Sequence, residues 1–142
     1  MYKRILLPVD LDQESSWGMA LPVALEYCQI FGARLYLMTV LPDFGMSMIG
    51  TYFPPDFVEK AEKDAGTRLE TLAREKVSPN VPVEWRVARG TVYEEILDVA
   101  REVHADLIVM ASHRPALKDY LLGPNAARVV RHSDVSVLVV RR

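Results

Sequence analysis

Apolar and polar positions along this chain follow two spacings, one typical of strands and one typical of amphipathic helices. Continuous apolar runs predict strands that are buried on both faces of a sheet. A run in which every second residue is apolar predicts a strand with one buried face, as at a sheet edge. The continuous runs are Ile5–Leu7, Leu35–Leu41, Leu107–Met110 and Val137–Val140, and the alternating run is Val81–Val87.

Apolar residues three and four apart predict a helix between each pair of successive strands. These helices cover about residues 17–28, 57–72, 92–103 and 124–130. Ser15 or Ser16 is expected to cap the first helix and Gly32 to end it, while Pro22 predicts a kink or a late start. The segment Thr91–Glu94 has the pattern of a capping box.

The predicted elements alternate regularly between strand and helix from one end of the chain to the other. This order favours an α/β fold with an open parallel five-stranded sheet, right-handed crossovers and helices on both faces, as in Rossmann-like proteins. The length of 142 residues suits a single domain spanning 1–142, and no internal repeat or linker divides it.

Composition narrows the possible functions. The chain has 17 basic and 19 acidic residues, a net charge of −2, which argues against binding to nucleic acid or to an anionic membrane. Cys28 is the only cysteine, so no intrachain disulfide forms and no Cys/His cluster suggests a metal site. No apolar run reaches the ~20 residues of a membrane helix and no signal peptide is recognisable, so a cytoplasmic protein is expected.

Candidate ligand-binding residues follow the predicted strands. Open parallel sheets bind ligands beyond the carboxyl ends of their strands, where the strand order reverses. The residues expected there are Pro8, Val9 and Asp10 after the first strand, Thr39 and Val40 at the end of the second, and Met110, Ala111 and Ser112 at the end of the fourth. The helix opened by Gly123-Pro124-Asn125 offers unpaired N–H groups to an anion, next to the basic His113, Arg114 and Lys118.

Asp10 has two interpretations at this stage: it accepts hydrogen bonds from ribose hydroxyls, or it only caps a helix or braces a turn. The chain has no P-loop and no G-x-G-x-x-G fingerprint, which argues against a standard NTPase or a nicotinamide dehydrogenase. No nucleophile–base pair or acidic metal cluster is recognisable, so these residues do not predict an enzyme.

Four segments together resemble the universal stress protein family, over essentially the whole chain. They are Met1–Asp10, Ala105–His113, Leu121–Gly123 and Val137–Val140. The resemblance implies a sheet in the order 3-2-1-4-5, homodimers joined through the last strand, and binding of ATP, or of ADP or AMP, with Mg²⁺ as a possible companion. The residues carried over are Pro8, Val9 and Asp10 near the nucleoside, Val40 and Met110 around the base, and Ala111, Arg114, Gly123, Pro124, Asn125 and Ala126 near the phosphates.

The sequence departs from the ATP-binding branch of that family, which carries Gly-x-x-Gly-x9-Gly-[Ser/Thr] after the fourth strand. Ala111 and Arg114 stand at the two leading glycines, eight residues rather than nine precede Gly123, and Pro124 replaces the hydroxyl residue. Arg114 then either pairs with phosphate oxygens or fills the space that glycine leaves for them.

Two functions remain open. The first is a stress-response regulator that binds an adenine nucleotide with little or no turnover, at most slow ATP hydrolysis. The alternative is a nucleotide-free dimeric interaction module with an unidentified protein partner. An enzyme such as an adenylyl transferase is disfavoured because it needs further catalytic motifs. Three further interpretations stay open for the Met-rich loop Pro42–Pro55, which is a lid, a partner surface or a dimer contact. Cys28 is expected in the core, and the charged face of the second helix is expected in solvent.

Overall fold

The computed structural model of the protein describes residues 1–42, 56–112 and 124–141. Within these residues, five parallel strands form one sheet in the order β3-β2-β1-β4-β5. The strands are β1 (Arg4–Pro8), β2 (Arg34–Leu41), β3 (Val83–Arg89), β4 (Leu107–Ala111) and β5 (Ser136–Val140). The predicted fold class and strand order are therefore confirmed, including β3 as an edge strand.

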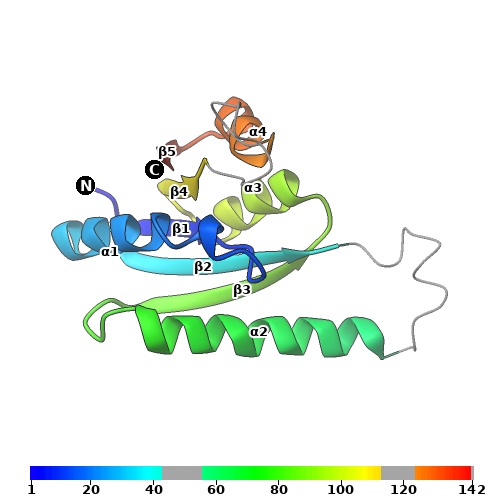
Figure 1. The fold of residues 1–142 in the computed structure, drawn as a ribbon. Coiled ribbons are helices and arrows are strands. Elements are labelled where there is room, and N and C mark those ends of the chain that lie inside the picture. Colours follow the sequence, from blue (N-terminus) through cyan, green and yellow to red (C-terminus); the bar gives the residue numbers. More distant parts are fainter. Residues whose placement is uncertain (43–55, 113–123, 142) are drawn as a thin grey trace.

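Helices cover both faces of the sheet, as predicted (Figure 1). They are the 3-10 helix η1 (Glu14–Ser16) and the α-helices α1 (Ala20–Phe31), α2 (Phe57–Lys76), α3 (Val92–Glu102) and α4 (Pro124–His132). Buried residues of α1 and α2 pack with one face of the sheet, and those of α3 and α4 pack with the other. Because each helix returns antiparallel to its strands, the first turns of α2, α3 and α4 lie near the carboxyl ends of the strands.

The start of α1 differs from the prediction. Ser15 and Ser16 lie in η1 and do not cap α1, which begins at Ala20 without a side-chain cap. Pro22 lies in the first turn of α1, where a missing N–H costs no helical hydrogen bond, so the predicted late start is confirmed. Gly32 ends the helix with a φ of 67°, the left-handed conformation that glycine adopts without strain.

The other helix starts follow the sequence more closely. Thr91 is the residue before α3 and has an extended backbone, but its side chain makes no capping hydrogen bond, so only the position of the expected capping box is correct. Helix α4 begins at Pro124, as predicted from the tolerance of the first helical position for proline.

The core fixes the two strands that carry the site. Leu6 and Leu7 of β1 and Ile108 and Val109 of β4 have no exposed surface, and β1 pairs directly with β4. Burying each such side chain stabilises the fold by about 1.5–3 kcal/mol. No helix among the described residues is long and apolar enough to span a bilayer.

Candidate functional site

A cavity of about 770 Å³ lies at the carboxyl ends of β1, β2 and β4. This volume falls within the roughly 300–1,000 Å³ typical of small-molecule sites. Ten of the predicted site residues line the cavity: Pro8, Val9, Asp10, Val40, Met110, Ala111, Ser112, Pro124, Asn125 and Ala126. Arg114 and Gly123 lie outside the described residues, as do His113, Lys118 and residues 43–55, so their predicted roles stay predictions.

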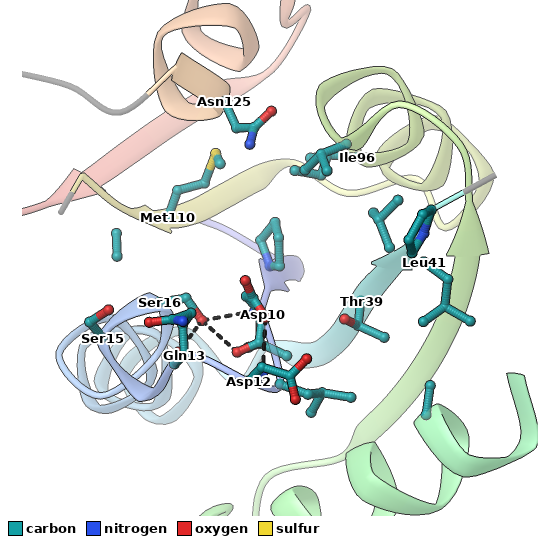
Figure 2. Close-up of a pocket in the computed structure, with 18 of the residues that line it drawn as sticks. Asp10, Asp12, Gln13, Ser15, Ser16, Thr39, Leu41, Ile96, Met110 and Asn125 are labelled. Atoms are coloured by element: carbon teal, nitrogen blue, oxygen red, sulfur yellow. Dashed lines mark hydrogen bonds between the residues drawn. The ribbon is translucent and has the colours of Figure 1, made fainter. Parts of the chain in front are cut away.

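The inner wall of the cavity is apolar. Val9 is 5% exposed and Met110 is 7% exposed, and both close the cavity at the strand ends. Val40 at the end of β2 and Ile96 of α3 continue this wall, with Ile96 almost fully buried. Figure 2 shows Met110 and Ile96 on the same side of Asp10 as Asn125. A flat apolar ring can therefore lie against this wall without leaving a buried polar group unpaired.

Asp10 stands at the exposed end of β1, held in a hydrogen-bonded turn. Its backbone N–H donates to Oγ of Ser16 over 2.8 Å, and its Oδ1 accepts the backbone N–H of Asp12 over 3.0 Å. The hydroxyl of Ser16 donates in turn to the carbonyl of Gln13 over 2.8 Å. The turn-bracing role that the sequence left open is therefore present, and the carboxylate retains acceptor capacity toward the cavity.

The first turn of α4 forms the opposite side of the cavity. Pro124 and Asn125 line it, and Asn125 lies across the open space from Asp10 in Figure 2. The N–H groups of the first helical turn have no partner within the helix, and together with the helix dipole they favour an anion. Arg131 and His132 fall in the last turn of α4, where cations complement the negative end of the same dipole.

Helix α2 contributes a wall that the sequence did not predict. Ala61, Asp64, Ala65 and Arg68 line the cavity from successive turns of α2. The charged face of α2 was expected to be only solvated, but these turns lie beside the strand ends, so Asp64 and Arg68 border the cavity. The spacing of Asp64 and Arg68 gives no signal of a binding role, because residues four apart share a face on any exposed helix. The one signal in the sequence is that their helix follows the second strand, whose carboxyl end borders the cavity.

The remaining wall comes from η1 and the end of β2. Gln13, Ser15 and Ser16 line the cavity from the turn that follows β1. Thr39 also lines it and is the one buried polar residue among those described, at 5% exposure. Thr39 was expected at the strand ends beside Val40, but the residues carried over from the family do not include it.

Two side chains of the described residues have a pKa that their surroundings raise. Burial raises the pKa of Cys28, which lies in the core as predicted. The pKa of Glu95 is also raised, mainly by desolvation and to a smaller extent by repulsion from Asp98 and Glu94. Neither side chain lines the cavity. In the described part of the chain, no three His, Cys, Asp or Glu side chains are grouped closely enough to hold a metal ion.

The fold and cavity define a doubly wound parallel α/β protein with a ligand-sized cavity at its topological switch point. The family model of the universal stress protein family matches residues 1–141. The chain therefore belongs to the universal stress protein family.

Individual relatives extend over the whole chain. Universal stress protein G of Shigella flexneri is 33% identical, over 99% of this chain and 100% of its own length. The solved structure of protein MJ0577 of Methanocaldococcus jannaschii has a TM-score of 0.76 and 26% identity, covering 100% of this chain and 97% of that one. A universal stress protein from Archaeoglobus fulgidus, solved in complex with dAMP, has a TM-score of 0.65 and 19% identity, covering 97% of each chain.

Proposed function

We propose that this protein is a regulatory protein that binds ATP, or ADP or AMP, in the cavity between β1 and β4, with little or no turnover. The single observation that carries the proposal is the cavity itself, which has an apolar wall, an exposed carboxylate and a helix N-terminus around one volume of about 770 Å³. Adenosine phosphates match these three features: their flat ring suits the apolar wall, their ribose hydroxyls can donate to the carboxylate, and their phosphates suit the helix N-terminus.

The proposed orientation follows from charge. Asp10 repels phosphate and accepts hydrogen bonds from ribose hydroxyls or from an amino group, so the nucleoside lies on its side of the cavity. The phosphates extend toward Asn125 and Ala126 at the start of α4, with Mg²⁺ as their companion ion where the tail is a triphosphate. The base lies against Val40 and Met110.

The relatives support the fold of the proposed nucleotide-binding protein. The Archaeoglobus fulgidus protein with dAMP has the same fold, but at 19% identity it supports the fold rather than the ligand of this chain. A role in the stress response and a cytoplasmic location remain predictions based on the family and the sequence. The proposal therefore depends on the cavity of this chain.

Two measurements test nucleotide binding. Purified protein is denatured and the released small molecules are separated and identified by absorbance and mass, with an adenine nucleotide expected. Protein freed of ligand is then titrated with ATP and Mg²⁺ during thermal unfolding. A ligand at 100 times its dissociation constant adds about 2.7 kcal/mol, which raises the midpoint of a chain of this size by roughly 5–10 °C. No released nucleotide and no shift with ATP, ADP or AMP would contradict the proposal.

Strand β5 supports a second candidate function, a dimeric interaction module. Its residues Val137–Val140 are half-buried, and among the described residues β5 pairs with β4 on one side only. An apolar edge strand of this kind favours pairing with another chain. We propose a homodimer joined through this strand, and in the alternative function the dimer forms and works without any nucleotide.

Light scattering at micromolar concentration tests the dimer, and a dimer mass is expected. Val139→Lys places a charge on the edge strand and should give monomers. Ile30→Lys is the matched control because Ile30 is 73% exposed on α1, far along the chain from β5. A monomer mass for the unaltered protein would refute the dimer without affecting nucleotide binding.

A further inference from the structure

The charged residues around the cavity are distributed unevenly. Four titratable side chains of the described residues line it: Asp10, Asp12, Asp64 and Arg68. Asp10 and Asp12 belong to the turn after β1, whereas Asp64 and Arg68 lie four residues apart on α2 and so share one helix face. Asp12 lies on the side of Asp10 that faces α2 (Figure 2). Three carboxylates and one guanidinium therefore meet on one side of the cavity, which we call the acidic wall.

The one guanidinium of the acidic wall is already engaged. Nη2 of Arg68 lies 3.1 Å from Oδ1 of Asp12 and donates over 2.9 Å to the backbone carbonyl of Leu11. Arg68 thus joins α2 to the turn after β1 and offsets the charge of Asp12. Among the described residues, no ion pair joins Asp10 or Asp64 to a cation, so their two charges leave the acidic wall net negative.

The opposite side of the cavity has the reverse polarity. Pro124, Asn125 and Ala126 line it, and none of them carries a charge. The N–H groups of Asn125 and Ala126 lie in the first turn of α4, at the positive end of the helix dipole. A ligand with one anionic end and one uncharged end is therefore oriented by the field inside the cavity, with its uncharged, hydrogen-bond-donating end at the acidic wall.

We propose that the acidic wall makes the cavity selective for adenosine nucleotides whose ribose carries no phosphate at the 2′ or 3′ position. This inference rests on the proposed function, and it adds that Asp64 and Asp10 reject a second anionic group at the nucleoside end. A phosphate on the ribose places about two negative charges next to two carboxylates in a partly enclosed site, where like charges repel more strongly than in bulk water. Phosphates at the 5′ position avoid this repulsion because they extend toward α4.

The test adds a ribose phosphate to one and the same 5′-monophosphate. The affinities of 5′-AMP, 3′,5′-ADP and 2′,5′-ADP are measured by calorimetry on the ligand-free full chain at low salt. All three probes carry one adenosine and one phosphate at the 5′ position, so they differ only in the phosphate on the ribose. We expect 5′-AMP to bind about tenfold more tightly than the other two, and the ratio to shrink in high salt because the Debye length falls.

Two substitutions that change the charge of the acidic wall in opposite directions test whether this wall causes the selectivity. Asp64→Asn removes one negative charge from an exposed helix face and should narrow the affinity ratio several-fold. Arg68→Gln removes the cation that offsets the charge of Asp12 and should widen the affinity ratio. Arg68→Lys keeps a positive charge at this position and should leave the affinity ratio close to that of the unaltered protein. Thermal unfolding midpoints of all variants show whether each remains folded.

The outcomes separate this inference from the proposed function. Equal affinities for the three nucleotides, or a ratio that neither Asp64→Asn nor Arg68→Gln changes, would overturn the selectivity while nucleotide binding stands. Failure of 5′-AMP and ATP to bind at all would overturn both together.

Discussion

The backbone N–H of Asp12 donates a hydrogen bond of 3.0 Å to Oδ1 of Asp10 at the end of β1. This is an Asx turn, in which a side-chain carboxylate replaces a backbone carbonyl two residues before the donor. It fixes the direction of the Asp10 carboxylate relative to β1, whose residues before it are buried in the sheet. A carboxylate has two oxygens, so bracing the turn leaves Asp10 able to accept a bond from a ligand.

Replacing Asp10 by alanine should weaken nucleoside binding. Hydrogen bonds to charged groups contribute about 1.5–3 kcal/mol, so Asp10→Ala is expected to lower the affinity for adenosine and for ATP by roughly 10–100-fold. Asp10→Asn is the matched control, since the amide oxygen can still accept the bond from Asp12 and preserve the turn. Calorimetric affinities for both ligands decide the question, and an unchanged affinity in Asp10→Ala would restrict Asp10 to its role in the turn.

Ser16 holds the same turn from the other side. Its Oγ accepts the N–H of Asp10 over 2.8 Å and donates to the carbonyl of Gln13, so Ser16→Ala removes one group that makes both bonds. The expected cost is about 1–2 kcal/mol of unfolding free energy, measured by urea denaturation, together with a weaker affinity for ATP. Ser15→Ala is the control, because Ser15 also lines the cavity but the structure records no hydrogen bond of its side chain to another described residue. Equal stability of the two variants would contradict the role given to Ser16.

The strand ends of this site were predictable, and its helical wall was not. Pro8, Asp10 and Met110 follow from two rules: buried apolar runs are parallel strands, and ligands lie at their carboxyl ends. Pro124 follows from a third rule, because proline suits the first position of a helix whose N-terminus attracts anions. Arg68 obeys no such rule, because a charged residue on an amphipathic helix looks the same whether it faces solvent or borders a cavity. Its contribution depends on how α2 lies across the sheet, which is a property of packing and not of local spacing.

The helix starts show a similar limit. Gly32 at the end of α1 and Pro124 at the start of α4 were predictable because each is suited to one backbone position. Ser15 and Ser16 were wrongly expected to cap α1, since several serine conformations satisfy backbone groups locally and the chain uses Ser16 to bind Asp10 instead. Glycine and proline therefore predict helix boundaries better than serine, which is compatible with several local hydrogen-bonding arrangements.

Arg114 remains the residue with the two opposed hypotheses, and it lies outside the described residues. If it pairs with phosphate oxygens, Arg114→Ala should weaken the binding of ATP by at least about tenfold and the binding of adenosine very little. Comparing the affinities of adenosine, AMP and ATP in the variant and the unaltered protein measures this difference. Tighter ATP binding in Arg114→Ala would instead show that the arginine fills the space of the missing glycine.

Cys28 is expected to be chemically inert in the folded protein. It is 2% exposed on the buried side of α1, and burial raises the pKa of its thiol from 9.0 to about 11. The thiolate is the reactive form, so modification by a thiol reagent at pH 8 should be slow in the folded protein and rapid in urea. Because the folded state holds its proton up to a higher pH than the unfolded state, this group's contribution to stability is present below pH 9 and is lost as the pH rises toward 11. Rapid modification without denaturant would mean that α1 opens locally and exposes the thiol.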